Sequence, residues 1–216
     1  MGTDQIFNIQ ELEEQLETPT VALTYWGSSH FTKRHGFQTA VTEIGGSWLP
    51  GHQAKHTFFA TGGKQMSKSV VRDILYDISI PSSANQHICV LGLGDNDLRA
   101  GRREEDFLDD IKELVSKWKT EGRGYLIITS LLPCPKTERF LGKRFAKVSR
   151  KIKEMVKGER NIKYFSLARL FVTRQEELRT ELYKDGLHLT DLGSLLVCSN
   201  LQSLTRQLIN ENHQTN

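Results

Sequence analysis

Short apolar segments alternate with longer amphipathic ones along this chain. The short runs, at 20–26, 56–60, 87–93, 125–129 and 162–165, are rich in β-branched and aromatic residues. Most of them are apolar on both faces, which is typical of strands in a parallel sheet that is covered on both sides. Between and after these runs, apolar residues recur at helical spacing over 66–78, 107–118, 141–155 and 192–208. The alternation predicts a three-layer α/β/α sandwich with right-handed crossover connections.

The length of the chain fits one domain. With 216 residues, it is long enough for one full hydrophobic core and too short for two. No repeat or Pro/Ser-rich linker divides it, so we expect a single domain over residues 1–216 with a frayed tail over 210–216. No apolar run reaches membrane-spanning length, and the first residues lack the basic end and apolar stretch of a signal peptide.

Cysteine usage and charge add little to this picture. Cys89, Cys134 and Cys198 are widely spaced and have no metal-site spacing, which favours reduced thiols in a cytoplasmic or nuclear protein. The net charge of +3 does not by itself indicate a nucleic-acid partner.

Polar or glycine-rich turns follow four of the predicted strands. The turns are Gly27-Ser28-Ser29-His30, Thr61-Gly62-Gly63-Lys64, Gly94-Asp95-Asn96-Asp97 and Asp185-Gly186-Leu187-His188. In parallel sheets the reacting groups lie in the loops at the carboxyl ends of the strands. We therefore expect these four turns to converge on one edge of the sheet.

The four turns contain the groups needed to activate a nucleophile. Asp185 and His188 are three residues apart, so the carboxylate can hold the imidazole in one tautomer and leave its other nitrogen free to accept a proton. Ser29 lies at a strand-to-helix turn and is the candidate nucleophile. The backbone N–H groups of Ser29 and Gly63, with the Asn96 side-chain amide, could bind a developing oxyanion.

In these four blocks and their order, the sequence resembles the SGNH hydrolases, the GDSL-type esterase and lipase superfamily. The resemblance extends over nearly the whole chain, and Gly-x-Asn-Asp and Asp-x-x-His are its specific motifs. It implies a flavodoxin-like five-stranded parallel sheet and a catalytic triad of Ser29, His188 and Asp185. It also implies an oxyanion hole formed by Ser29, Gly63 and Asn96. The implied activity is that of a serine esterase acting on small or medium acyl esters or lipid-like substrates, with no metal or organic cofactor.

Two features separate this chain from the usual family pattern. Ser28 stands where the family usually has an Asp that supports the loop, and Gly62 is an alternative to Gly63 as the oxyanion donor. With Trp26-Gly27-Ser28-Ser29-His30-Phe31 and Leu-Leu-Pro, the pattern also resembles the esterase domains encoded in the first open reading frame of some non-LTR retrotransposons. An Oskar-type domain of this fold lacks the triad and binds RNA, so the fold alone does not establish catalysis.

Structural roles are alternatives for each of these residues. Ser28 and Ser29 are suited to capping a helix, Asn96 is suited to a turn, and His188 could be a structural histidine. Thr190 is expected to cap the last helix in either case. The remaining histidines have no metal-ligand spacing, although His30 could line the pocket.

A basic segment over 143–163 suggests a competing function. Four cations there lie on one stripe of a predicted helix: Lys143, Lys147, Arg150 and Lys151. Such a face is either solvated surface or a phosphate-binding face for RNA or an anionic lipid. The alternative to the esterase is therefore a catalytically inactive SGNH-like domain that binds RNA or a protein partner.

Overall fold

A parallel five-stranded sheet forms the centre of the molecule. The computed structural model describes residues 18–44, 48–79, 84, 86–122 and 124–213. Its strands are β1 (Thr20–Gly27), β2 (Gln53–Ala60), β3 (Gln86–Gly92), β4 (Tyr125–Thr129) and β5 (Ile162–Phe165). They pair in parallel in the order β2-β1-β3-β4-β5. The predicted flavodoxin-like sheet is confirmed.

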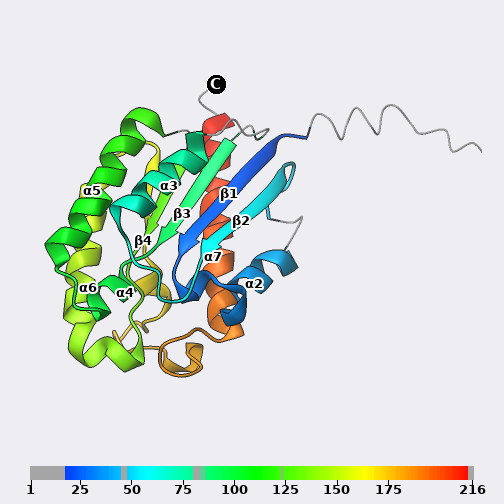
Figure 1. The fold of residues 1–216 in the computed structure, drawn as a ribbon. Coiled ribbons are helices and arrows are strands. Elements are labelled where there is room, and N and C mark those ends of the chain that lie inside the picture. Colours follow the sequence, from blue (N-terminus) through cyan, green and yellow to red (C-terminus); the bar gives the residue numbers. More distant parts are fainter. Residues whose placement is uncertain (1–17, 45–47, 80–83, 85, 123, 214–216) are drawn as a thin grey trace, which may run out of the picture.

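Helices cover both faces of this sheet (Figure 1). One layer contains α3 (Lys68–Ser79), α5 (Glu104–Glu121) and α6 (Pro135–Met155), and the other contains α2 (Phe37–Ile44) and α7 (Asp191–His213). Shorter helical turns lie in the connections. They are η1 (Ser29–Phe31), η2 (Lys33–His35), α4 (Asp95–Arg99), η4 (Leu167–Leu170) and η5 (Thr180–Leu182).

Successive strand residues belong to opposite cores, as the period of two in a strand requires. In β3, Ile88 and Val90 pack into the core beneath α2 and α7, while Cys89 and Leu91 pack into the core beneath α3, α5 and α6. All five residues of β4 are buried. This two-sided burial explains why the strands appear in the sequence as nearly continuous apolar runs.

The structure corrects three details of the prediction. β2 begins at Gln53, three residues earlier than expected, and α7 continues through Asn210 to His213, within the segment expected to fray. Leu192 and Leu195 belong to the predicted apolar stripe but are 59% and 45% exposed. The first turn of α7 packs through its other side, where Ser194 Oγ donates to the His35 carbonyl at 2.8 Å. Residues 1–17 and 214–216 of the expected domain lie outside the described residues.

Among the helices of the described residues, none is both long enough and apolar enough to span a bilayer. Cys89, Cys134 and Cys198 are free and buried.

Candidate active site

Strand register brings the first three predicted turns together. Gly27 at the end of β1 pairs with Ala60 of β2 on one side and with Gly92 of β3 on the other. The backbone continues this contact beyond the strands, because the Ser28 N–H donates to the Gly92 carbonyl at 3.3 Å and the Thr61 N–H donates to the Gly27 carbonyl at 3.3 Å. The three loops therefore start side by side at one edge of the sheet.

The Asp185–His188 pair has the geometry expected of an oriented base. His188 Nδ1 lies 2.8 Å from Asp185 Oδ2, and Asp185 Oδ1 accepts the backbone N–H groups of His188 at 2.8 Å and Leu187 at 3.0 Å. These hydrogen bonds, led by the one from the His188 backbone, hold the pKa of Asp185 well below its usual value. An ionised Asp185 fixes the proton on Nδ1 and leaves Nε2 as the basic nitrogen.

Backbone hydrogen bonds hold this segment in the site. The Gly186 carbonyl accepts the Lys136 N–H at the start of α6 at 2.9 Å, and the His188 carbonyl accepts the Lys184 N–H at 2.8 Å. Thr190 caps α7 as predicted, because its Oγ1 accepts the Gly193 N–H at 3.1 Å.

Ser29 begins the short helix η1 and is half-buried. Its carbonyl accepts the N–H of Thr32 at 3.2 Å and the hydroxyl of Thr32 at 2.8 Å. Among the described residues, no hydrogen bond joins the Ser29 hydroxyl to His188. The next residue is close to this histidine, because the ring centroids of His30 and His188 are 6.3 Å apart. The structure thus brings the serine turn and the Asp185–His188 pair to the same edge.

The position of η1 depends on the packing of Phe31. Its buried ring lies against the ends of β1 and β3, where a Cβ on Gly27 would approach it to 2.3 Å and a Cβ on Gly92 to 2.5 Å. Glycine is therefore required at both strand ends for the turn that carries Ser29 to pack so closely. Ser28 does not cap η1 with its side chain, which contradicts the capping alternative for this residue.

The predicted oxyanion donors come from two linked loops. Asn96 is buried, and its Nδ2 donates to the Lys64 carbonyl at 3.0 Å, which leaves the second amide hydrogen for another acceptor. Gly63 is exposed and has a φ of 75°, a conformation that favours glycine whatever its N–H binds. Gly62 is also exposed. The geometry leaves both glycines as candidates.

Asp97, the last residue of the Gly-x-Asn-Asp block, joins the loops from the inside. It is fully buried and accepts the Met66 N–H at 3.0 Å and Arg102 Nη1 at 2.8 Å. Burial acts to raise the pKa of Asp97 and outweighs the opposing contacts with Arg102 and Met66. Its role is structural, because its two oxygens face the protein interior.

Sequence reasoning missed two residues of this site, His35 and Asp95. The His35 ring stacks on His188, with centroids 3.9 Å apart and planes within 3°. Burial, followed by the neighbouring charges of His188 and His30, lowers the pKa of His35 to about 4, so this ring is neutral at physiological pH. Asp95 contacts both Ser28 and His30. Only the extra acidic residue within the Gly-x-Asn-Asp block could have indicated it.

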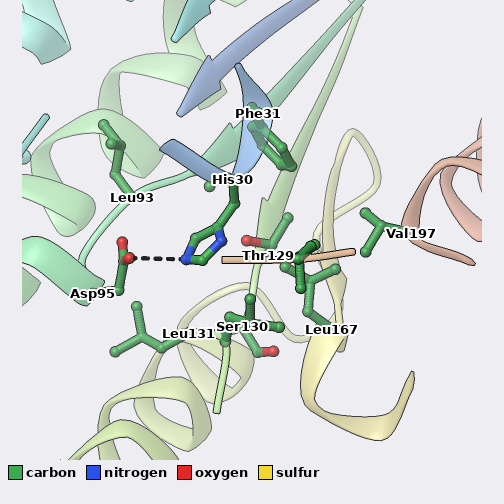
Figure 2. A pocket seen from close by; sticks show the side chains of 12 residues that line it. His30, Phe31, Leu93, Asp95, Thr129, Ser130, Leu131, Leu167 and Val197 are labelled. Carbon is green, nitrogen blue, oxygen red and sulfur yellow. Dashed lines mark ion pairs between the residues drawn. The ribbon is translucent and has the colours of Figure 1, made fainter. Parts of the chain in front are cut away.

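A small cavity lies beneath these residues (Figure 2). His30 lines it, as predicted, together with Asp95, Leu131, Leu167 and Leu189. Three of its residues are the chain neighbours of Ser29, Asn96 and His188. It leaves about 20 Å³ for the centres of water-sized molecules. In this conformation it can hold a group the size of one water, and not an extended acyl chain.

The basic residues of α6 lie on an exposed face. Lys147 Nζ is 2.8 Å from Glu104, whereas Lys143, Arg150 and Lys151 have no ion pair within the described ranges. Arg144, between them, also pairs with Glu104 at 3.1 Å. Part of the predicted cationic stripe is thus neutralised by α5. Where side chains are described, no cluster of His, Cys, Asp and Glu is arranged to hold a metal ion.

Comparisons with known proteins identify the fold. No family model and no curated protein matches the chain. A Bacteroides fragilis protein described as an acylhydrolase superposes with a TM-score of 0.65 at 17% identity, over 98% of this chain and 99% of that one. A lipolytic G-D-S-L family member from Veillonella parvula gives 0.62 at 15% identity, over 86% and 97%. The aryl esterase of M. smegmatis gives 0.60 at 11% identity, over 87% and 99%. The chain has the α/β fold of the GDSL-type, or SGNH, hydrolases.

Proposed function

We propose that this protein is a serine esterase that hydrolyses small or medium acyl esters through an acyl-enzyme. Ser29 is the nucleophile, His188 the general base and acid, and Asp185 the residue that orients the imidazole. The backbone N–H groups of Ser29 and Gly63 and the side-chain amide of Asn96 stabilise the oxyanion.

The chemistry proceeds in two halves. In the first, Ser29 Oγ attacks the ester carbonyl while His188 Nε2 takes its proton, and the tetrahedral intermediate collapses when the imidazolium protonates the leaving alcohol. In the second half, His188 takes a proton from water, which attacks the acyl-enzyme, and then returns that proton to Ser29 as the acid leaves. Donors to the oxyanion lower the barriers of both halves, and each donor raises the rate by about 10²–10³-fold.

The observation that carries this proposal is the Asp185–His188 contact of 2.8 Å, with Asp185 held ionised by three hydrogen bonds. This pair lies at the sheet edge where the Ser29 turn and Asn96 also lie. The solved structures with the same fold include an aryl esterase and a carbohydrate esterase, which supports ester bonds as the substrate class.

Labelling with a fluorophosphonate probe tests the assignment. We expect Ser29 of the wild type to be modified, as read by peptide mass spectrometry, and Ser29→Ala and His188→Ala to remain unlabelled. Ser199→Ala, on the exposed face of α7, and His52→Ala are the matched controls and should label like the wild type. Asp185→Asn should lower kcat on p-nitrophenyl acetate or butyrate by about 10⁴-fold. Near-wild-type turnover by Ser29→Ala would refute the mechanism.

The second candidate is a catalytically inactive domain that binds RNA. It is favoured by Lys143, Arg150 and Lys151, which are exposed on α6 without ion pairs in the described part of the chain. It predicts a folded protein that does not label, and RNA binding that weakens steeply with salt and is lost when these cations and Lys147 are neutralised together. The narrower resemblance to retrotransposon-encoded domains stays a prediction.

A further inference from the structure

The carboxylate of Asp95 lies between the two chain neighbours of the candidate nucleophile. His30 Nε2 is 3.3 Å from Asp95 Oδ2, and Ser28 Oγ donates to the same oxygen at 3.5 Å. Asp95 is only 6% exposed and Ser28 is fully buried. Figure 2 shows the His30 ring pointing at Asp95, and both side chains line the cavity. One buried oxygen thus contacts the residues immediately before and after Ser29.

We propose that Asp95 is a positioning residue that clamps Ser28 and His30 and thereby fixes Ser29 relative to the neighbouring oxyanion donor, Asn96. The kinetic consequences of this role rest on the proposed esterase function. The role itself is a property of the two loops and can be measured without turnover.

The charge state of Asp95 supports a clamp. Burial acts to raise the pKa of this carboxyl, but the hydrogen bond and charge of His30, with smaller contributions from Arg99 and the Asn96 backbone N–H, hold it below its usual value. A buried carboxylate is costly unless its oxygens have partners, so the ionised group favours loop conformations in which Ser28 and His30 reach it.

His30 depends on this contact for its orientation. Its other ring nitrogen, Nδ1, is buried and has no hydrogen-bond partner in the described part of the chain. The interaction with Asp95 is therefore the polar contact that sets the rotation of the ring. Because Phe31, the next residue, is packed against Gly27 and Gly92, the segment from Ser28 to Phe31 is held by a charge on one side and an aromatic ring on the other.

Because Ser28 and Asp95 are in direct contact, the carboxylate can be transferred from residue 95 to residue 28 by substitution. The two side-chain oxygens are 3.5 Å apart, so a carboxylate placed on residue 28 would occupy much of the space that Asp95 now fills. The exchange S28D/D95S keeps one negative charge between the loops, whereas S28D alone puts two there and D95S leaves none.

The wild type and these three variants, together with D95N, form the experiment. We expect D95S and S28D each to lower kcat on p-nitrophenyl acetate by about 10²-fold, because a displacement of about 1 Å in a reacting group has an effect of that size. The exchange should recover about tenfold or more relative to D95S, with KM changed little throughout. The conservative D95N should lie between the wild type and D95S. The matched control is D77N. Asp77 is a half-buried carboxylate near the C-terminal end of α3, and its replacement should leave kcat unchanged.

Hydrogen exchange measured by mass spectrometry supplies a readout that does not need activity. We expect faster exchange in peptides covering 28–31 and 92–97 in D95S, and recovery towards wild-type exchange in S28D/D95S. If the wild type neither labels nor turns over, the esterase assignment fails, and this exchange pattern still tests the clamp. The clamp would be overturned if D95S and D95N both had the kcat and the hydrogen exchange of the wild type. The clamp would also be overturned if D95S lost kcat with unchanged hydrogen exchange at 28–31 and if S28D/D95S recovered no kcat.

Discussion

Replacing Gly92 with Ala tests how closely the turn that carries Ser29 depends on the end of β3. The backbone of Gly92 does not have a positive φ, so Ala is allowed there and the effect comes from packing alone. The new Cβ would lie 2.5 Å from Cε2 and 2.8 Å from Cζ of Phe31. Carbon atoms in contact are about 3.5–4.0 Å apart, so the ring must move by about 1 Å.

Phe31 has little room for this movement. The ring is 2% exposed and lies 4.6 Å from Phe37 and 6.4 Å from Tyr25, measured between centroids. Overpacking of this kind costs about 1–3 kcal/mol of the free energy of unfolding. Because Phe31 is two residues from Ser29, a shift of about 1 Å should also lower kcat by up to about 10²-fold.

Urea denaturation and the rate of fluorophosphonate labelling would measure the two effects in Gly92→Ala, Phe31→Leu and the double variant. Leucine is shorter than phenylalanine and leaves space for the new methyl group, so the two substitutions should couple favourably by about 0.5–3 kcal/mol. Gly51→Ala is the control. It meets no atom within 4 Å but has a φ of 76°, so it should cost about 1–2 kcal/mol and leave labelling unchanged.

Additive stabilities in this cycle would refute the reasoning. So would a Gly92→Ala protein that is destabilised but labels at the wild-type rate, because the position of Ser29 would then be independent of Phe31.

Two further predictions concern stability. Burial lowers the pKa of His87 to about 4, below the usual value of 6.5, so the unfolded state takes up its proton first as the pH falls. Stability should therefore decrease between about pH 6.5 and 4, with His87 contributing up to about 1.4 kcal/mol per pH unit. His87→Gln should reduce the slope of the free energy of unfolding against pH, and His52→Gln should not. Equal slopes in the wild type and His87→Gln would contradict the assignment to His87. Thr190→Ala removes the cap of α7 and should cost about 1 kcal/mol by urea denaturation. Thr42→Ala, on an exposed helix face, should stay within about 0.5 kcal/mol, and equal losses would argue against the cap.

The sequence alone determined those features that depend on short-range pattern. Runs apolar on both faces indicated buried parallel strands, and in parallel strands the carboxyl ends meet at one edge, so the convergence of the four turns followed. The Asp185–His188 contact was predictable because three residues of chain can bring a carboxylate and an imidazole together without help from the rest of the fold. Thr190 as a cap is local in the same way.

Only the tertiary structure decided contacts that cross between loops. Asp95 meets Ser28 across 67 residues of sequence, and His35 stacks on a histidine more than 150 residues away. The exposure of Leu192 and Leu195 was equally hidden, because helical spacing specifies a stripe of side chains and not how far the neighbouring layer extends. Such contacts depend on strand register and on the conformation of each turn. Both are set by the packing of the whole core, including the ring of Phe31 against two glycines, and no window of sequence contains that information.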